Sequence, residues 1–150
     1  MAASVDLART VLVIEDSADD VDLMQKVIRK AGLEHLCRFV YDGAEAIAYM
    51  KGDEPFTHRR AYPFPDIVLL DLSLPKIDGF GVLEWMRTTP ECKDVKVIVC
   101  SGWEYGSYFE RARRAGACMI LKKEFIGEGL KELFGIIGSM VRQREAYECE

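Results

Sequence analysis

Four apolar runs in this chain are each followed by polar side chains that could take part in chemistry. The runs at 11–14, 67–70, 97–100 and 119–121 precede two carboxylates, one carboxylate, a hydroxyl and two ammonium groups, in that order. These groups belong to Glu15 and Asp16, to Asp71, to Ser101, and to Lys122 and Lys123. If the runs are parallel strands, their carboxyl ends meet at one edge of a sheet, where ligand sites form. A metal-assisted phosphoryl acceptor requires such a set of groups.

The carboxylates of this set predict a bound cation. Two bare carboxylates about 4 Å apart repel by roughly 4 kcal/mol at an effective dielectric constant of about 20. Glu15, Asp16 and Asp71 would therefore need a proton or a cation beside them. An all-oxygen ligand set with open positions favours Mg²⁺ or Mn²⁺.

Distinct chemical roles can be assigned to these residues. Asp71 follows the central apolar run and is the expected nucleophile, because a carboxylate can form an acyl phosphate when the phosphoryl charge is neutralised. The cation would be held by Asp71 and Asp16, and by Glu15 through water. Lys123 would pair with one phosphoryl oxygen, and Ser101 would donate a hydrogen bond to another.

Each residue also has an ordinary structural interpretation when it is taken alone. Glu15 and Asp16 fit a polar cap at a strand end, and Asp71 fits a turn residue. Ser101 fits a helix N-cap, and a lone lysine after a strand fits a solvated charge. Their occurrence together, at successive strand ends, favours the phosphoryl acceptor.

The composition is that of an ordinary globular domain. The chain has 150 residues and a formal net charge of −5, so it lacks the electrostatic attraction that supplies most nucleic-acid affinity. No apolar stretch approaches the roughly 18 residues of a membrane span. The five cysteines are scattered without metal-ligand spacing. We therefore expect a cytoplasmic protein with reduced thiols that contacts neither nucleic acid nor membrane.

Alternating apolar runs and amphipathic segments predict an α/β fold with a mostly parallel sheet covered on both faces. Strands are expected near 11–15, 36–41, 66–71, 95–100 and 117–121. Ser17 with Asp20 resembles a capping box at the start of the first helix, and Gly32 is its expected stop. A fourth helix with Tyr105 and Ala112 on one face is expected to end at Gly116.

Two segments each fit two alternative roles in such a fold. The stretch from Gly52 to Pro65 is predicted to be an exposed loop, either a passive insertion or a partner contact. The longest helical pattern runs from Ile126 to about Glu145. Ile136 and Met140 widen its apolar stripe, which fits either a broad core-facing surface or a homodimer or partner surface.

Four segments, taken together, resemble the receiver domain of two-component response regulators. They are VLVIEDS (11–17), DIVLLDLSLPKIDGFGVL (66–83), VIVCSG (97–102) and AGACMILKK (115–123), and the resemblance extends from about 11 to about 141. It implies a flavodoxin-like, doubly wound five-stranded parallel sheet in the order 2-1-3-4-5 with five flanking helices. It also implies phosphorylation of an aspartate by a histidine kinase, and a requirement for Mg²⁺.

The resemblance assigns a family role to individual residues. Asp71 is similar in place to the phosphoacceptor, and Glu15 and Asp16 to the acidic metal pair. The remaining assignments are the backbone carbonyl of Ser73 as a third metal ligand, Ser101 as the switch hydroxyl, and Lys123, seven residues after Gly116, as the family lysine.

The sequence departs from the family pattern at two positions. Glu124 stands where a proline usually follows the family lysine through a cis peptide. Ile120 occupies the place of the aromatic residue that commonly rotates inward on activation. The resemblance thus implies intact phosphorylation with an altered readout.

The sequence therefore predicts a single receiver domain over residues 1–150, with a core from about 10 to 141 and a last helix reaching about 145. It resembles the stand-alone receivers that serve phytochrome-type kinases. Such a protein accepts its phosphoryl group by self-catalysed transfer, loses it by self-catalysed dephosphorylation, and is not a turnover enzyme. Its expected partners are a histidine kinase and a downstream protein target or phosphotransfer protein.

Three other functions share a feature with this sequence, either an aspartate after an apolar strand or the same fold. A phosphatase of the haloacid dehalogenase type needs a second acid two residues after the nucleophile, where this chain has Ser73. A flavin-binding module needs a phosphate loop after the first strand, but the acidic EDSADD segment (15–20) would repel phosphate. A phosphorylation-independent receiver-like scaffold is supported by Glu124 and Ile120.

Overall fold

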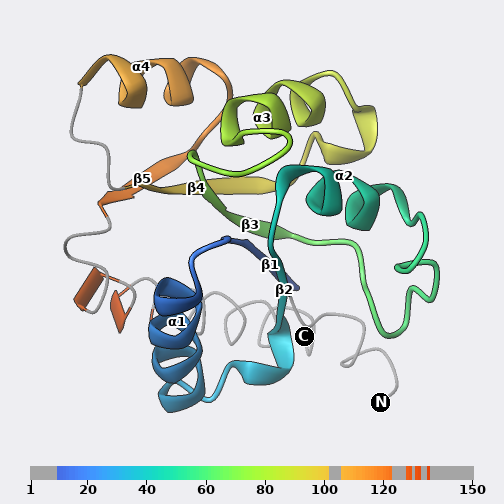
Figure 1. Ribbon diagram of the computed structural model, residues 1–150, viewed down its shortest axis with the longest axis vertical. Coiled ribbons are helices and arrows are strands. Elements are labelled where there is room, and N and C mark those ends of the chain that lie inside the picture. The colour runs from blue at the N-terminus through green and yellow to red at the C-terminus, as the bar shows by residue number, and fades with distance from the viewer. Residues whose placement is uncertain (1–9, 102–105, 123–127, 130, 133–134, 136–150) are drawn as a thin grey trace, which may run out of the picture.

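The protein forms a five-stranded parallel sheet with helices on both faces (Figure 1). The computed structural model describes residues 10–101, 106–122, 128–129, 131–132 and 135. The strands are β1 (Val11–Ile14), β2 (Cys37–Val40), β3 (Ile67–Asp71), β4 (Lys96–Ser101) and β5 (Met119–Lys122). The helices are α1 (Ala18–Lys30), α2 (Gly43–Lys51), α3 (Gly79–Arg87) and α4 (Gly106–Arg114), with short 3₁₀ turns at Glu34–Leu36 and Pro90–Cys92.

The strand order confirms the predicted topology. The order is β2-β1-β3-β4-β5, and every neighbouring pair is parallel. β3 is the central strand, paired with β1 on one side and β4 on the other. This pairing matters for function because it places the residues that follow β1 and β3 beside each other at one edge of the sheet.

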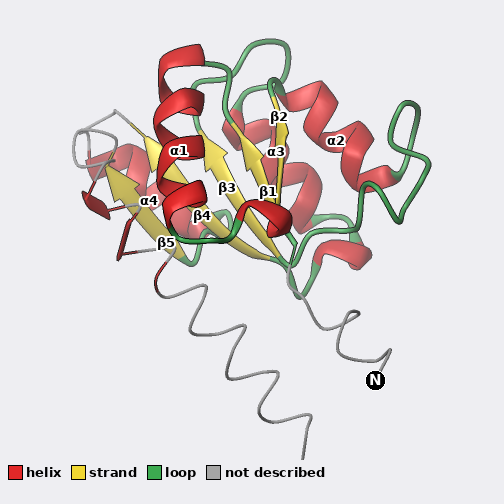
Figure 2. Ribbon diagram, turned by 90° about the horizontal axis from the view of Figure 1, so that it is seen from below, coloured by secondary structure: helices red, strands yellow, loops and turns green. Residues whose placement is uncertain are grey.

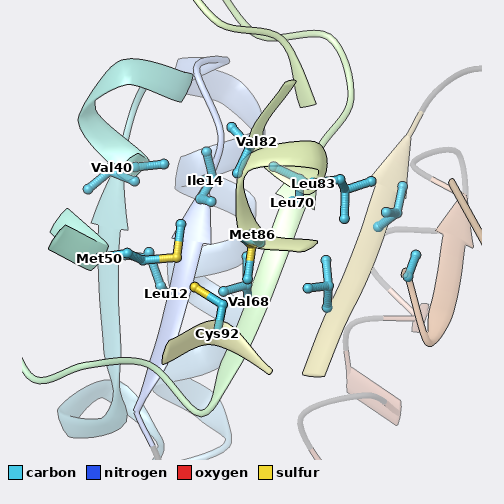
Figure 3. Packing of buried hydrophobic residues seen from close by; sticks show 14 of the residues in the cluster. Leu12, Ile14, Val40, Met50, Val68, Leu70, Val82, Leu83, Met86 and Cys92 are labelled. Atoms are coloured by element: carbon cyan, nitrogen blue, oxygen red, sulfur yellow. The ribbon is translucent and has the colours of Figure 1, made fainter. Parts of the chain in front are cut away.

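Alternate residues of the strands face the two helical layers. Figure 2 shows helices on both sides of the sheet, and Figure 3 shows Leu12, Ile14, Val68 and Leu70 in the layer that packs with α2 and α3. Val11, Val13 and Leu69 pack with α1, whereas Leu12 and Leu70 pack with α2 and α3. Because both faces are buried, the strands appear in sequence as continuous apolar runs rather than alternating patterns.

The helix boundaries follow the expected capping signals. The Ser17 hydroxyl accepts a hydrogen bond from the Asp20 backbone N–H at 3.4 Å, which caps α1. Gly32 follows the helix with a φ of +72°, a conformation that favours glycine. α4 ends at Arg114, and Gly116 lies just beyond it.

None of the described helices is long and apolar enough to cross a bilayer. Tyr105 and most of the helix predicted over 126–145 lie outside the described residues.

The segment from 52 to 65 is more firmly attached than an exposed loop would be. Half of its residues are exposed, whereas Pro65 is buried and Phe56 is only 8% exposed. The Phe56 ring lies 5.1 Å from that of Tyr49 and 5.2 Å from that of Tyr62, measured between centroids. In addition, Arg38 of β2 donates a hydrogen bond to the Ala61 carbonyl at 2.9 Å, so the loop lies against the outer strand of the sheet.

Arg59 joins this loop to the end of α2. Its guanidinium donates to the backbone carbonyls of Tyr49 and Met50, each at 2.7 Å, and to that of Tyr62 at 3.1 Å. A cation at the carboxyl end of a helix is also favoured by the helix dipole. Burial raises the pKa of Tyr49 to about 12, so its hydroxyl stays protonated and donates to the Pro63 carbonyl at 2.8 Å.

We expect Arg59→Ala to lower the free energy of unfolding by about 2 kcal/mol, because it removes the guanidinium hydrogen bonds to the Tyr49 and Met50 carbonyls at the end of α2. The Tyr49 carbonyl keeps its hydrogen bond from the Gly52 N–H. Arg60→Ala is the matched control, since Arg60 is an exposed neighbour in the same loop, and it should change stability by less than about 0.5 kcal/mol. Urea denaturation of the two variants measures the difference. Equal effects would show that the Arg59 hydrogen bonds do not anchor the loop.

Candidate functional site

Three carboxylates meet where β1 and β3 end. Glu15 and Asp16 follow β1, and Asp71 is the last residue of β3. One ligand oxygen from each lies within 4.8 Å of the others. The register explains this meeting, because Ile14 pairs with Leu70 and the next residues of the two strands therefore lie side by side. The predicted acidic cluster is thus confirmed as a cluster in space.

Backbone hydrogen bonds orient two of these side chains. The Glu15 side-chain Oε1 accepts from the Ser17 N–H at 3.1 Å, and the Glu15 N–H donates to the Val40 carbonyl at 3.1 Å. The Asp71 Oδ1 accepts from the Ser73 N–H at 3.0 Å. The carboxylates are therefore positioned by the chain that immediately follows each strand.

The burial of the cluster fits a divalent cation. Glu15 is 0% and Asp71 4% exposed, whereas Asp16 is exposed to solvent. Placing like charges this close is costly where water is largely excluded, and a cation removes the repulsion. The donors are all oxygen, the ligand type that Mg²⁺ and Mn²⁺ prefer. Within the described part of the chain this is the only group of three or more metal-ligating side chains.

The loop after Asp71, residues 72–78, turns back onto the end of β3. The Gly79 N–H donates to the Leu72 carbonyl at 3.0 Å and closes the loop at its base. A β-carbon at Gly79 would stand 2.5 Å from the Asp71 carbonyl oxygen, so only glycine lets α3 start this close to the strand. Asp78 caps α3 by accepting from the Gly81 N–H at 2.8 Å. Sequence reasoning missed Gly79, although its Asp-Gly dipeptide before an amphipathic segment was an available signal.

The strand register places the backbone of Ser101 at the same edge of the sheet. Asp71 pairs with Cys100 in the register, so Ser101, the last residue of β4, lies one residue beyond the level of Asp71 at the same edge of the sheet. Ser101 pairs in turn with Lys122, the last residue of β5. Ile120 is half-buried and packs against the core cluster beneath α2 and α3. Lys123 and Glu124 lie outside the described residues.

The sequence model of the response regulator receiver domain matches residues 11–134. The chain belongs to the response regulator receiver domain family. A curated relative, the response regulator Rcp1 of Synechocystis sp., is 33% identical over 91 residues, which cover 61% of this chain. The match covers 60% of the length of Rcp1.

Solved structures of receiver domains share this fold. RPA3017, a response regulator in red light signaling of R. palustris, is 32% identical with a TM-score of 0.75 over 84% of this chain and 91% of its own. The phosphorylated cyanobacterial phytochrome response regulator RcpA is 27% identical with a TM-score of 0.72 over 88% and 90%. The Mn²⁺-bound form of Rcp1 is 27% identical with a TM-score of 0.70 over 88% and 91%. The receiver domain described above is therefore of the two-component signalling type, and its acidic cluster fits a metal site.

We expect Asp16→Asn to raise the free energy of unfolding of metal-free receiver domain by about 0.5 to 1 kcal/mol, because it removes a charge from the cluster. The same variant should lose most of the stabilisation that Mg²⁺ gives the parent protein, since ligand binding stabilises only the state that binds it. Thermal unfolding in EDTA and in Mg²⁺ measures both effects.

Asp19→Asn provides the control, because Asp19 is an exposed acid in the first turn of α1 and lies outside the cluster. It should keep the full response to Mg²⁺. A normal Mg²⁺ response in Asp16→Asn would show that this carboxylate is not a ligand.

Proposed function

We propose that this chain is a single-domain response regulator that accepts a phosphoryl group on Asp71 from a histidine kinase in a Mg²⁺-dependent reaction. One observation carries the proposal: three carboxylates, two of them buried, have ligand oxygens within 4.8 Å of one another at the ends of β1 and β3. Of the three, Asp71 stands on the central strand, which suits the residue that must be held most rigidly.

The cation and the acceptor would divide the chemistry. Mg²⁺ or Mn²⁺, held by Glu15, Asp16, Asp71 and the backbone carbonyl of Ser73, would neutralise charge on the phosphoryl oxygens. A carboxylate oxygen of Asp71 would attack phosphorus, forming a P–O bond while the P–N bond of the donor phosphohistidine breaks. The histidine nitrogen keeps the electron pair of that bond and takes up a proton.

The chain itself would orient the attacking group. The hydrogen bond from the Ser73 N–H to Asp71 Oδ1 limits rotation of the carboxylate, and holding a nucleophile in one orientation lowers the entropic part of the barrier. On the family resemblance, the Ser101 hydroxyl would donate to one phosphoryl oxygen and the Lys123 ammonium would pair with another.

Signalling would follow from phosphorylation-dependent binding to another protein. The kinase would be of the phytochrome type, a proposal supported by the likeness to RcpA and RPA3017. The output partner would be a protein target or a phosphotransfer protein, and the protein would act in the cytoplasm without turning over an external substrate. With Ile120 at the usual aromatic position, the conformational change that reports phosphorylation would differ from the inward rotation of an aromatic side chain.

A homodimer through the apolar stripe with Ile136 and Met140 stays a prediction, because those residues lie outside the described part of the chain.

Acetyl phosphate with Mg²⁺ tests this proposal, because the small donor replaces the unidentified kinase. We expect the intact mass to rise by about 80 Da, the mass of one phosphoryl group. The gain should vanish in EDTA and in Asp71→Asn. It should persist in Asp53→Asn, which removes an exposed acid of the loop before β3.

Two results would count against phosphorylation at this site. A gain that survives in Asp71→Asn would place the phosphoryl group elsewhere. No gain under any condition, with beryllofluoride and Mg²⁺ also leaving thermal stability unchanged, would favour the phosphorylation-independent scaffold.

A further inference from the structure

The start of α2 supports the loop that follows Asp71. Gly43 is the first residue of α2 and is buried. A β-carbon there would overlap the carbonyl oxygen of Ile77 well inside van der Waals contact. No left-handed φ is needed at Gly43, so its role is to leave space. Its missing side chain lets the Ile77 carbonyl rest directly against α2.

A second contact joins the same two segments. Asp42 caps α2, because its Oδ1 accepts from the Glu45 N–H at 2.7 Å. Its Oδ2 lies 3.3 Å from the Lys76 ammonium. Lys76 has a φ of +65°, a left-handed conformation that is unfavourable for a residue with a side chain. This ion pair and the packing of Ile77 help to hold Lys76 in that conformation.

The loop is thus fixed on two sides. Its base is closed on β3 by the hydrogen bond from Gly79 to Leu72, and its far side rests on α2 through Lys76 and Ile77. Between these attachments lies Ser73, which is exposed and whose N–H binds the Asp71 carboxylate. Displacing the far side of the loop would therefore change the position of the backbone around Ser73.

We propose that Gly43, assisted by Asp42, is a positioning residue for the metal site, because it fixes the loop that carries the Ser73 carbonyl. This inference rests on the proposed function, in which the carboxylates and that carbonyl bind Mg²⁺. Mg²⁺ demands nearly ideal octahedral geometry at short distances, so a backbone ligand on a loop must be held in place. Gly43 provides no ligand and carries no charge, and its effect on the metal is purely geometric.

The test compares Gly43→Ala with Gly81→Ala. Each substitution adds one uncharged methyl group, and in both variants the added β-carbon meets Ile77. The β-carbon of Gly81→Ala approaches a side-chain methyl of Ile77 at 2.7 Å, whereas that of Gly43→Ala meets the Ile77 backbone. A side chain can turn aside, but the backbone can move only with the loop.

The Mg²⁺ dissociation constant of the unphosphorylated protein, measured by calorimetry, is the first readout. Gly43→Ala should raise it about 10-fold, the usual effect of losing a group that orients a ligand, while Gly81→Ala stays within about 2-fold of the parent. Amide hydrogen exchange of residues 72–78 in EDTA is the second readout, and it should be faster in Gly43→Ala alone. Unchanged affinity and exchange in a folded Gly43→Ala would overturn the inference.

Asp42→Asn keeps the proposal testable if Gly43→Ala does not fold. Asparagine caps helices as well as aspartate does, so this variant removes the ion pair with Lys76 and keeps the cap. The exchange rate across 72–78 in EDTA should rise about 2-fold, because the ion pair has one solvent-exposed partner, Lys76, and contributes modestly. Asp53→Asn, which removes the exposed ion pair with Lys51, should leave it unchanged. Equal exchange in both variants would contradict the inference.

The two proposals fail in different ways. A parent protein that binds no Mg²⁺ would overturn the proposed function and, with it, any role for Gly43. The parent protein could instead bind Mg²⁺ and accept a phosphoryl group on Asp71, while a folded Gly43→Ala variant binds Mg²⁺ with the same affinity. That result would overturn only the role of Gly43.

Discussion

The repulsion among three carboxylates is the constraint that the rest of this structure must satisfy. Glu15 and Asp71 are almost fully buried, and together with Asp16 their ligand oxygens lie within 4.8 Å of one another. Without a cation such an arrangement lowers stability, so a rigid frame must hold it. The frame is the pairing of β1 with β3, two strands that are buried on both faces. The stability of the core therefore offsets the strain of the site, and a bound cation would remove that strain.

Close backbone contacts form a second layer of support around this site. Both α2 and α3 begin with the same dipeptide, Asp-Gly, in which the aspartate caps the helix and the glycine leaves space. At Gly79 the space admits the end of β3, and at Gly43 it admits the Ile77 carbonyl. The loop between Asp71 and α3 is consequently held at its base and on its far side, although most of its residues are exposed to solvent.

Sequence reasoning could predict the strands and the acidic cluster because both depend on local or repeated patterns. Strands buried on both faces appear as apolar runs, and the polar residues that end those runs must share an edge once the sheet is parallel. It could not predict the contact of Gly43 with Ile77 or the anchoring of the 52–65 loop by Arg59. The contact of Gly43 with Ile77 joins residues far apart in the chain. Arg59 contacts residues three to ten positions away, from a loop whose sequence carries no periodic signal. The roles of Ser73, Ser101 and Lys123 stay predictions that rest on the family resemblance.

The most direct test of the central claim locates the phosphoryl group on the chain. Borohydride reduces an aspartyl phosphate to homoserine, so protein treated with acetyl phosphate and Mg²⁺ can be reduced, digested and sequenced by mass spectrometry. We predict homoserine at position 71 alone, and none when EDTA replaces Mg²⁺. Homoserine at another aspartate, or a phosphorylated protein that yields no homoserine, would contradict the assignment of Asp71 as the acceptor.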